Sequence, residues 1–523
     1  MATIIKKIRL INFKRFKDYV IEPNKRINVF IGDNEAGKSS ILEAIALVSN
    51  GNVGRVESIG LDRLFNMDVI TEFLERKERK FDDLPSLHIE LYLTGEFDHT
   101  MNGKNNSEGT AEDGIRLVCR PNADYRNEVA EILRDHNDYF PYEYYSIHFS
   151  TFADEPYSGY KKKIRFVMID SSNMKSEYAT DEFVRRMYIQ YTQDNEKERA
   201  LHNSQYRLLR NQFRVESLDG LNSRLKNQNY SFGLKSGSSM HLDGDLMIYE
   251  DKIGIDSKGT GRQVFIKTEF ALERPGINVD IILLEEPENH LSHVNLRKLI
   301  QRVADTQDGQ IFITTHNSLI STRLELKNLL IMHMNGMDCP VGLKDLSDDT
   351  AKYFMKTPPA SMVEYVLAQK SILVEGPAEY MLMEKFYKSI AKNLPEKNDV
   401  HIIDVRGLSF KRYLDIAKLT GSKVAVLTDN DADPQRNCID KYMDYCDDEN
   451  IEIFFEKDLN KRTFEVVLYG DNQDLCDKLF KGNAQAYMLN NKTEAAYRLL
   501  SLDKELVVPD YIRRAIEWIK GLY

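Results

Sequence analysis

The 523-residue sequence predicts an α/β protein in which one large α/β region is followed by a second, smaller one. Three observations lead to this fold class. The chain is too long for a single hydrophobic core. Very apolar runs such as "VDIILLE" and "QIFITT" are typical of strands in the buried centre of a parallel sheet. Towards the C-terminal end, "SILVEG", "HIIDVRG", "KVAVLTD" and "IEIFFE" alternate with helical segments, which predicts a separate sheet.

Composition narrows the class of protein. The chain is 42% hydrophobic and 29% charged, as in soluble globular proteins, and no run approaches the roughly 20 apolar residues of a membrane span. Its five cysteines are widely spread without paired metal spacing, so we expect a reducing, cytoplasmic location and no membrane association. The net charge of −11 argues against non-specific coating of nucleic acid. It leaves room for phosphate contact through a bound divalent metal.

Changes of pattern along the chain predict the domain boundaries. Strand-like runs fill a first domain, residues 1–345, and a strongly charged helical segment at about 178–228 interrupts them as an inserted lobe. Gly, Pro and Asp clusters predict a linker at 346–368, and residues 369–523 form the second domain. The lobe is a candidate dimerisation element, and a plain solvated insertion is the alternative.

A phosphate-binding loop opens the first domain. "GDNEAGKSS" fits the pattern G-x-x-x-x-G-K-[ST] between an apolar strand and a helix. Backbone N–H groups would hold the phosphates of ATP, Lys38 would add charge, and the Ser39 hydroxyl would bind Mg²⁺. A plain glycine turn is the alternative. The predicted ATP-binding residues of this loop are Gly32, Asn34, Gly37, Lys38, Ser39 and Ser40.

A second acidic motif belongs with this loop. "IILLEEPE" delivers Glu285 and Glu286 at the carboxyl end of an apolar strand, where such sheets bind ligands. We predict that Glu285 supports the metal and that Glu286 is the base that orients the attacking water. "IFITTHN" brings His316 to the end of the next strand, towards a γ-phosphate. A solvated strand end and a structural histidine are the alternatives.

The order of motifs in the first domain resembles a known ATPase family. "INFKRF", the phosphate loop, "SKGTGRQ", "LLEEPE" and "TTHN" are arranged as in the ABC-type head of structural-maintenance and recombination proteins. In that family the signature loop of one subunit closes on the ATP of another, which implies a homo-oligomer and ATP contacts from Ser257 and Gly259. The signature here, with Gly261 and Gln263, only approximates the usual Leu-Ser-Gly-Gly pattern.

A second acidic site is predicted in the smaller domain. In "SILVEGPAEY", Glu375 ends a strand, Pro377 suits the first position of a helix, and Glu379 lies in the first helical turn. In "KVAVLTDNDAD" another strand ends at Asp429 and Asp431, which share a face of an extended chain. Because such carboxylates repel one another, the cluster favours Mg²⁺ or Mn²⁺, and two such ions about 4 Å apart can promote phosphodiester cleavage.

Glu-Gly-x-x-Glu followed by Asp-x-Asp resembles the Toprim domain of topoisomerases, primases and certain nucleases. "KRTFEVVL" and "NNKTEAAYRLL" match two further pieces of its nuclease branch. An ATPase head with an inserted lobe, followed by Toprim, resembles the overcoming-lysogenization-defect (OLD) family of endonucleases. This resemblance implies a Rossmann-like Toprim domain with Lys492 as the positive group at the scissile phosphate. The implied metal ligands or bases are Glu375, Glu379, Asp429, Asp431 and Glu465.

The resemblance implies an ATP-regulated, metal-dependent DNA endonuclease of anti-phage defence, with Mg²⁺ or Mn²⁺ at both sites. A protein partner encoded nearby, a helicase or a reverse transcriptase, is also implied. Asp433 is a weaker candidate ligand, and Gly407 matches a family glycine loosely. One alternative is an ATP-switched nucleic-acid sensor or scaffold. A topoisomerase would need a separate DNA-gate domain, and a plain repair ATPase would leave Glu375 and Asp429 unexplained.

Overall fold

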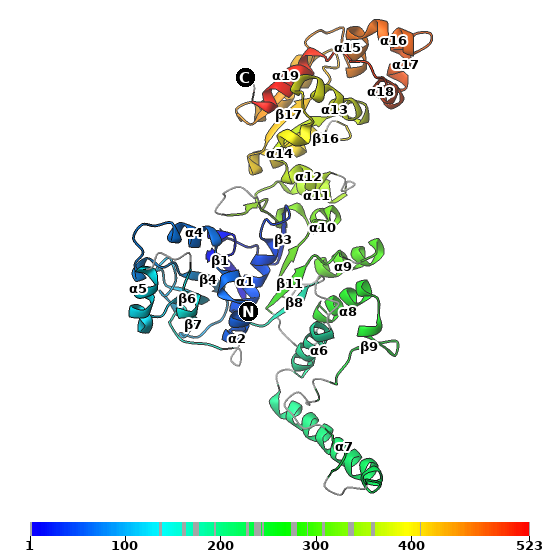
Figure 1. The fold of residues 1–523 in the computed structure, drawn as a ribbon. Helices are drawn as coiled ribbons and strands as arrows, with labels where there is room; N and C mark the ends of the chain where they lie inside the picture. Colours follow the sequence, from blue (N-terminus) through cyan, green and yellow to red (C-terminus); the bar gives the residue numbers. More distant parts are fainter. Residues whose placement is uncertain are drawn as a thin grey trace. The chain divides into compact units, whose positions relative to one another are not determined.

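The computed structural model describes most of the chain. The described residues are 3–134, 139–158, 164–170, 177–192, 195–225, 230–234, 242, 245–272, 280–289, 291–305, 309–332, 339–356, 361–407 and 409–521. Contacts divide the chain into two compact units, here called unit 1 (Met1–Val29 and Gly37–Thr315) and unit 2 (Phe30–Ala36 and His316–Tyr523). Figure 1 labels their elements.

An antiparallel sheet forms the first part of unit 1. Its strands pair in the order β2-β1-β4-β6-β5, with β7 also on β6. The bounds are β1 (Ile4–Phe13), β2 (Phe16–Ile21), β4 (Leu87–Thr94), β5 (Asn102–Gly103), β6 (Glu112–Pro121) and β7 (Tyr145–Thr151). Ile8 and Leu10 of β1 are fully buried, as the period-two alternation of this strand predicts. The helices around this sheet are α1 (Lys38–Asn50), α2 (Val53–Ile59), α3 (Leu61–Leu64), α4 (Met67–Leu74) and α5 (Arg126–Arg134).

Parallel strands form the second part of unit 1. The strand β11 (Ile281–Glu285) pairs in parallel with β12 (Gln310–Thr314) on one side and β8 (Phe166–Asp170) on the other. Ile281 to Leu284 are buried, which explains why "IILL" is apolar throughout. The helices α8 (Thr260–Leu272) and α9 (His293–Asp305) contact each other beside these strands (Figure 1).

The segment predicted as a helical insertion carries two helices, α6 (Glu177–Tyr191) and α7 (Glu196–Asn222). No residue of α7 is buried. Asn195 caps this helix, since its side chain accepts the backbone N–H groups of Lys197 and Glu198. Residues 193–194 and 226–228 of the predicted insertion lie outside the described residues. The hairpin β9 (Tyr249–Glu250) and β10 (Ile253–Gly254) follows it.

Unit 2 contains a four-stranded sheet in the order β16-β15-β17-β18. All its pairings are parallel, so the carboxyl ends of the strands share one edge. The bounds are β15 (Lys370–Val374), β16 (Val400–Asp404), β17 (Lys423–Leu427) and β18 (Ile451–Phe454). Its central strands are buried at nearly every position, which is why "ILV" and "VAVL" carry no polar alternation.

Helices cover this sheet (Figure 1). One core joins Ile372, Val374, Ala425 and Leu427 of the central strands to α13 and to the C-terminal helices. Each fully buried large apolar side chain stabilises such a core by roughly 1.5–3 kcal/mol. The helix α14 contacts β17 and contributes no residue to that core. The helices are α13 (Pro377–Ala391), α14 (Phe410–Thr420), α15 (Phe464–Asp471), α16 (Gln473–Leu479), α17 (Ala484–Asn490), α18 (Lys492–Leu500) and α19 (Asp510–Lys520).

Shorter elements precede this sheet in unit 2. They are α10 (Ser318–Arg323), β13 (Leu329–Met332), β14 (Val341–Gly342), α11 (Asp348–Lys356) and α12 (Met362–Leu367). The segment predicted as a linker, 346–368, therefore carries two helices, and Tyr365 of α12 donates its hydroxyl to the carbonyl of Tyr413 in α14. Among the residues that the structure describes, no helix has the length and apolar character needed to cross a membrane.

Candidate functional site

Two carboxylates lie where β15 passes into α13. Glu375 follows the last residue of β15, Pro377 starts the helix, and Glu379 lies in its first turn. The proline suits this position because the first helical N–H has no intrahelical partner. The backbone N–H of Gly407, in the turn after β16, donates to the carbonyl oxygen of Glu375 (2.8 Å). Gly407 has a φ of 115°, so this turn favours glycine.

The loop after β17 brings two more carboxylates to the same edge. Asp429 accepts the backbone N–H of Phe464 at 2.8 Å through Oδ1, which ties it to the start of α15. Asp431 has a φ of 47°, and its backbone N–H donates to the carbonyl of Arg462 (3.2 Å). Asp433 instead accepts the backbone N–H of Arg436 (3.1 Å). The loop that follows β18 is therefore bonded to the loop that follows β17.

Glu465 and Lys492 form an ion pair at this edge. Glu465 lies in the first turn of α15 and is 3% exposed. Its Oε2 accepts the hydroxyl of Thr463 at 3.0 Å and lies 3.1 Å from Nζ of Lys492, the first residue of α18. The lysine side chain is 52% exposed, so it reaches from the surface to a buried acid. A buried carboxylate is stable only with such partners.

The ionisation of these groups shows that they act on one another. The pKa of Asp429 is raised to about 8, first by burial and then by neighbouring carboxylates, of which Glu375 acts most strongly. The pKa of Glu379 is raised to about 7 by burial and by the charges of Glu465 and Glu375. Burial and the charge of Asp431 raise the pKa of Glu375. For Lys492, burial lowers the pKa, but the charge and hydrogen bond of Glu465 outweigh it and the net shift is upward.

The donor set fits divalent cations. Oε2 of Glu375 is buried and has no hydrogen-bond partner. Buried polar atoms are normally paired, so this oxygen is suited to coordinate a cation. Oxygen-only ligands suit Mg²⁺ or Mn²⁺. In the described part of the chain, however, no three His, Cys, Asp or Glu side chains already converge as a metal site. Cation binding would therefore require side-chain rotations, with Glu465 shared between Lys492 and the ion.

Sequence reasoning gave little weight to Gly407 and missed Thr463, although both fix site residues. Thr463 directly precedes the helix that carries Glu465, and its hydroxyl holds that carboxylate. A hydroxyl two residues before a predicted ligand was the available signal. Gly407 holds Glu375 through a backbone hydrogen bond, and such a bond leaves no sequence signal other than the glycine.

The phosphate loop is shaped by its backbone. Gly37 precedes α1 with a φ of 93°, and a Cβ at this position would lie 2.6 Å from Cζ of Phe16. Glycine is therefore required both by conformation and by space. Lys38 is 5% exposed and starts the helix, with Ser39 and Ser40 after it in the first turn. Gly32 and Asn34 of the same motif belong to unit 2.

The two glutamates after "IILL" differ in setting. Glu285 is the last residue of β11. Glu286 has a φ of 40°, its backbone N–H donates to the carbonyl of Thr314 (3.0 Å), and its Oε2 accepts the amide of Asn289 (2.7 Å). His316 is an exposed residue two positions after β12 and belongs to unit 2.

The signature-like loop is held by contacts that the sequence did not reveal. Ser257 donates its backbone N–H and its hydroxyl to Asp256, at 2.7 and 3.1 Å. Gln263 of α8 donates to the carbonyls of Asp256 (3.1 Å) and Lys258 (2.8 Å). Gly259 has open space where a Cβ would stand. Glu250 of the β9–β10 hairpin pairs with both Lys258 and Arg262.

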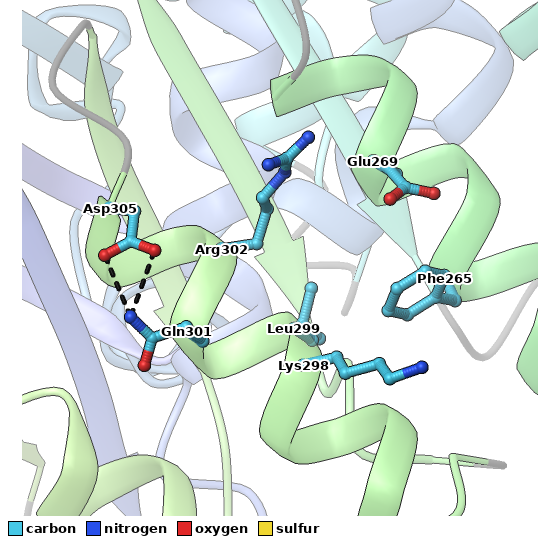
Figure 2. Close-up of a pocket in the computed structure, with 7 residues that line it drawn as sticks. All are labelled: Phe265, Glu269, Lys298, Leu299, Gln301, Arg302 and Asp305. Atoms are coloured by element: carbon cyan, nitrogen blue, oxygen red, sulfur yellow. Dashed lines mark hydrogen bonds between the residues drawn. The ribbon is translucent and has the colours of Figure 1, made fainter.

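A cavity of about 460 Å³ lies in unit 1, between α8 and α9 (Figure 2). Phe265 and Leu299 give it an apolar part, and Lys298 and Glu269 give it charges of both signs. Gln301 and Asp305 also line it and are hydrogen-bonded to each other (2.9 Å). None of the predicted site residues lines it, and we assign it no ligand.

Three family models match separate segments of the chain. A model described as "Overcoming lysogenization defect protein-like, TOPRIM domain" matches residues 366–431. A model described as "AAA ATPase domain" matches residues 4–239, and a further AAA domain model matches residues 256–322. The N-terminal part therefore matches ATPase domains of the AAA type, and a match to an OLD-like Toprim domain follows it. The predicted family resemblance and fold class are confirmed.

Individual relatives match parts of the chain. The DNA replication and repair protein RecF of Alkaliphilus oremlandii is 32% identical over 93 residues, which cover 18% of this chain and 24% of RecF. The chain thus matches about a quarter of the length of that relative. A crystal structure of an Smc head bound to a domain of ScpA is 15% identical and covers 66% of this chain and 100% of its own, with a TM-score of 0.32. The solved C-terminal region of the OLD protein of Xanthomonas campestris pv. campestris is 16% identical to this chain. The match covers 30% of this chain and 95% of that region, with a TM-score of 0.23.

Proposed function

We propose that this chain is a metal-dependent DNA endonuclease whose Toprim domain cuts and whose ATPase domain regulates the cutting. The observation that supports it most is the gathering of carboxylates at one sheet edge, with raised pKa values and one unpaired buried oxygen. A scaffold does not require carboxylates that repel one another at one site. They are stable only if protons or cations compensate their charge.

The proposed roles follow from position. The carboxylates of Glu375, Glu379, Asp429, Asp431 and Glu465 would hold Mg²⁺ or Mn²⁺. When bound there, these ions would neutralise the charge that develops on the attacking and leaving oxygens of a phosphodiester. Lys492 already lies at the site with its ammonium group 3.1 Å from Glu465, and it would place a positive charge near the scissile phosphate. Glu375, which follows β15 at the edge where the other carboxylates lie, would also accept a proton from the attacking water.

In the ATPase domain we assign phosphate binding to the loop that ends at Lys38, and Mg²⁺ binding to Ser39. Glu285 would support that metal, Glu286 would orient the attacking water, and His316 would contact the γ-phosphate. Ser257 and Gly259 would approach the ATP of a second subunit. The nucleotide state would then open or close access to the carboxylates of the Toprim domain.

The helix α7 is a candidate surface for binding a second copy of the chain. Large apolar side chains on this helix are exposed, among them Leu208 (66%), Leu209 (65%) and Phe213 (52%). Helices in proteins are stabilised mainly by packing, yet no residue of this 27-residue helix is buried within the chain. We therefore propose that α7 packs against a second copy of the chain and is the dimerisation element. A cytoplasmic role in anti-phage defence, with a helicase or reverse transcriptase encoded nearby, completes the proposal on the basis of the OLD-like domain.

One observation favours a second candidate, an ATP-switched nucleic-acid sensor whose Toprim domain binds without cutting. The ion pair between Lys492 and Glu465 occupies a carboxylate that a cation would need. In this case the pair would be permanent and the domain would recognise nucleic acid without catalysis.

A plasmid-nicking assay separates the two candidates. The purified parent chain is incubated with supercoiled DNA across Mg²⁺, Mn²⁺ and ATP, beside Asp429→Ala. We expect metal-dependent nicking by the parent and none by the variant. Asp448→Ala is the control, since Asp448 precedes β18, lies outside the proposed ligand set and likewise accepts a backbone N–H through its side chain. Nicking by Asp429→Ala at the parent rate, or a parent that never cuts, would refute the endonuclease.

A further inference from the structure

Asn430 stands between the two aspartates of the proposed metal site and is 1% exposed. Its side-chain amide donates to three backbone carbonyls, those of Glu456 (2.7 Å), Asp458 (3.1 Å) and Lys461 (3.2 Å). Its Oδ1 accepts the backbone N–H of Ala432 (2.9 Å). With two N–H groups for three acceptors, the donor capacity of the side chain is fully used.

These three carbonyls belong to one connecting segment. Residues 455–463 run from the end of β18 to α15, whose first turn carries Glu465. Irregular connections of this kind are mobile unless other groups hold them. Two further bonds join the same two loops, one from the N–H of Phe464 to Asp429 and one from the N–H of Asp431 to Arg462. Asn430 supplies the largest share of the cross-loop bonds.

We propose that Asn430 is a positioning residue that sets Asp429 and Asp431 on one side of the metal site against Glu465 on the other. This rests on the proposed metal-dependent function. Asn430 contacts neither substrate nor cation, and it acts by holding two loops in register. The side chain of Asn430 points into the loop at 455–463, which leads to the third acid, Glu465.

The alternative is a purely structural role, in which Asn430 only keeps the domain folded. Asn472 provides the matched case. It is also buried (8% exposed), and its amide donates to the carbonyls of Leu468 (3.1 Å) and Val507 (3.0 Å). Its Oδ1 accepts the N–H of Val507 (2.8 Å). It ties α15 and α16 to a C-terminal segment and has no contact with the loop at 455–463.

The test is Mn²⁺ binding by the full chain without nucleotide, measured by isothermal titration calorimetry. The variants are Asn430→Ser, whose hydroxyl can still accept the N–H of Ala432, and Asn472→Ser. We expect Asn430→Ser to weaken Mn²⁺ binding by about 10- to 100-fold, the range for losing a group that orients metal ligands. Asn472→Ser should lower the unfolding temperature without changing Mn²⁺ affinity. In the nicking assay, Asn430→Ser should need more Mn²⁺ and approach the parent rate when Mn²⁺ saturates.

Equal Mn²⁺ affinity of Asn430→Ser and the parent, or an equal loss in both serine variants, would overturn the positioning role. If Asn430→Ser does not fold, Asn430→Gln and Asn472→Gln make the same comparison, because the longer amide displaces the loop without removing its donors. A parent chain that neither binds Mn²⁺ nor nicks DNA would instead show that the proposed function is wrong.

Discussion

The phosphate loop and the carboxylate cluster are two different ways to build a site that acts on phosphate groups. The loop is contiguous, from Gly32 to Ser40, and its shape comes from backbone, as the left-handed Gly37 shows. The cluster is assembled from side chains on four segments between Glu375 and Lys492. A site built from backbone tolerates little change of conformation, and Lys38 is the side chain that adds charge to it. A side-chain site depends on each charge and on the loops that hold it.

The strongest way to separate the two regions is Lys38→Ala. ATP hydrolysis should fall by on the order of 100- to 1,000-fold, the range for removing one preorganised donor from a site of developing charge. Mn²⁺ binding in the absence of nucleotide should stay at the parent value, because the carboxylates lie in the Toprim domain. Hydrolysis is measured by phosphate release and Mn²⁺ binding by calorimetry.

Lys17→Ala is the control for that change, since Lys17 is an exposed lysine of β2 paired with Glu72. Undiminished hydrolysis by Lys38→Ala would show that the loop does not bind phosphate as proposed.

Lys492→Ala probes the other region. DNA nicking should fall by about 100-fold, the lower end of the range for a lost electrostatic donor, while ATP hydrolysis is unchanged. The physical reason is that the ammonium group lies 3.1 Å from a 3% exposed glutamate and beside the proposed metal ligands. Nicking rates at saturating Mn²⁺ give the measurement.

Lys478→Ala, on the exposed surface of α16, is the matched control. If Lys492→Ala nicks DNA as fast as Lys478→Ala, its proposed place at the scissile phosphate is wrong.

A pair of glycine substitutions sharpens the comparison. Gly37→Ala should destabilise unit 1 by about 1–2 kcal/mol from its left-handed backbone, and by more through contact with Phe16. Gly376→Ala, at the start of α13, should cost less than about 1 kcal/mol. Gly376 is extended (φ −158°), and a Cβ there would meet its nearest atom, Oε2 of Glu379, at 3.6 Å. Urea unfolding measures both changes, and an equal cost for the two would contradict the distinction.

The sequence predicts the strands and the residues next to them, but not the contacts that depend on how distant helices and loops pack. The strands "IILL" and "VAVL" are apolar because they are buried in parallel sheets, so the pattern reports the fold directly. Glu375 and Glu379 follow from the strand–helix passage at Pro377. Glu465 and Lys492 came only from the order of family motifs, because their 3.1 Å contact depends on how α15 and α18 pack. Asn430 was invisible because its bonds go to backbone carbonyls, which are present at every residue.

The smallest expected effect concerns pH and the carboxylate cluster alone. In the metal-free chain the pKa of Glu379 is about 7 and that of Asp429 about 8, against ordinary values of 4.5 and 3.8. Between the ordinary and the raised values the folded state binds more protons than the unfolded state, so stability falls as pH rises. This contribution is fully present below about pH 4 and is lost as pH passes through about 7 to 8.

Trp518 makes the effect measurable in unit 2 alone. It is the single tryptophan of the chain, and its ring lies against Phe454 of β18 and the ammonium group of Lys423. With a chelator present, the unfolding temperature from Trp518 fluorescence should fall between pH 5.5 and 8.5 by about 3 °C or more, the shift that about 1 kcal/mol produces in a domain of this size. Asp429→Asn should flatten that slope. Mn²⁺ should reverse it, because cations hold the carboxylates in their ionised form and bind more tightly as protons leave. An identical slope in the parent and in Asp429→Asn would mean that the four segments do not share one electrostatic site.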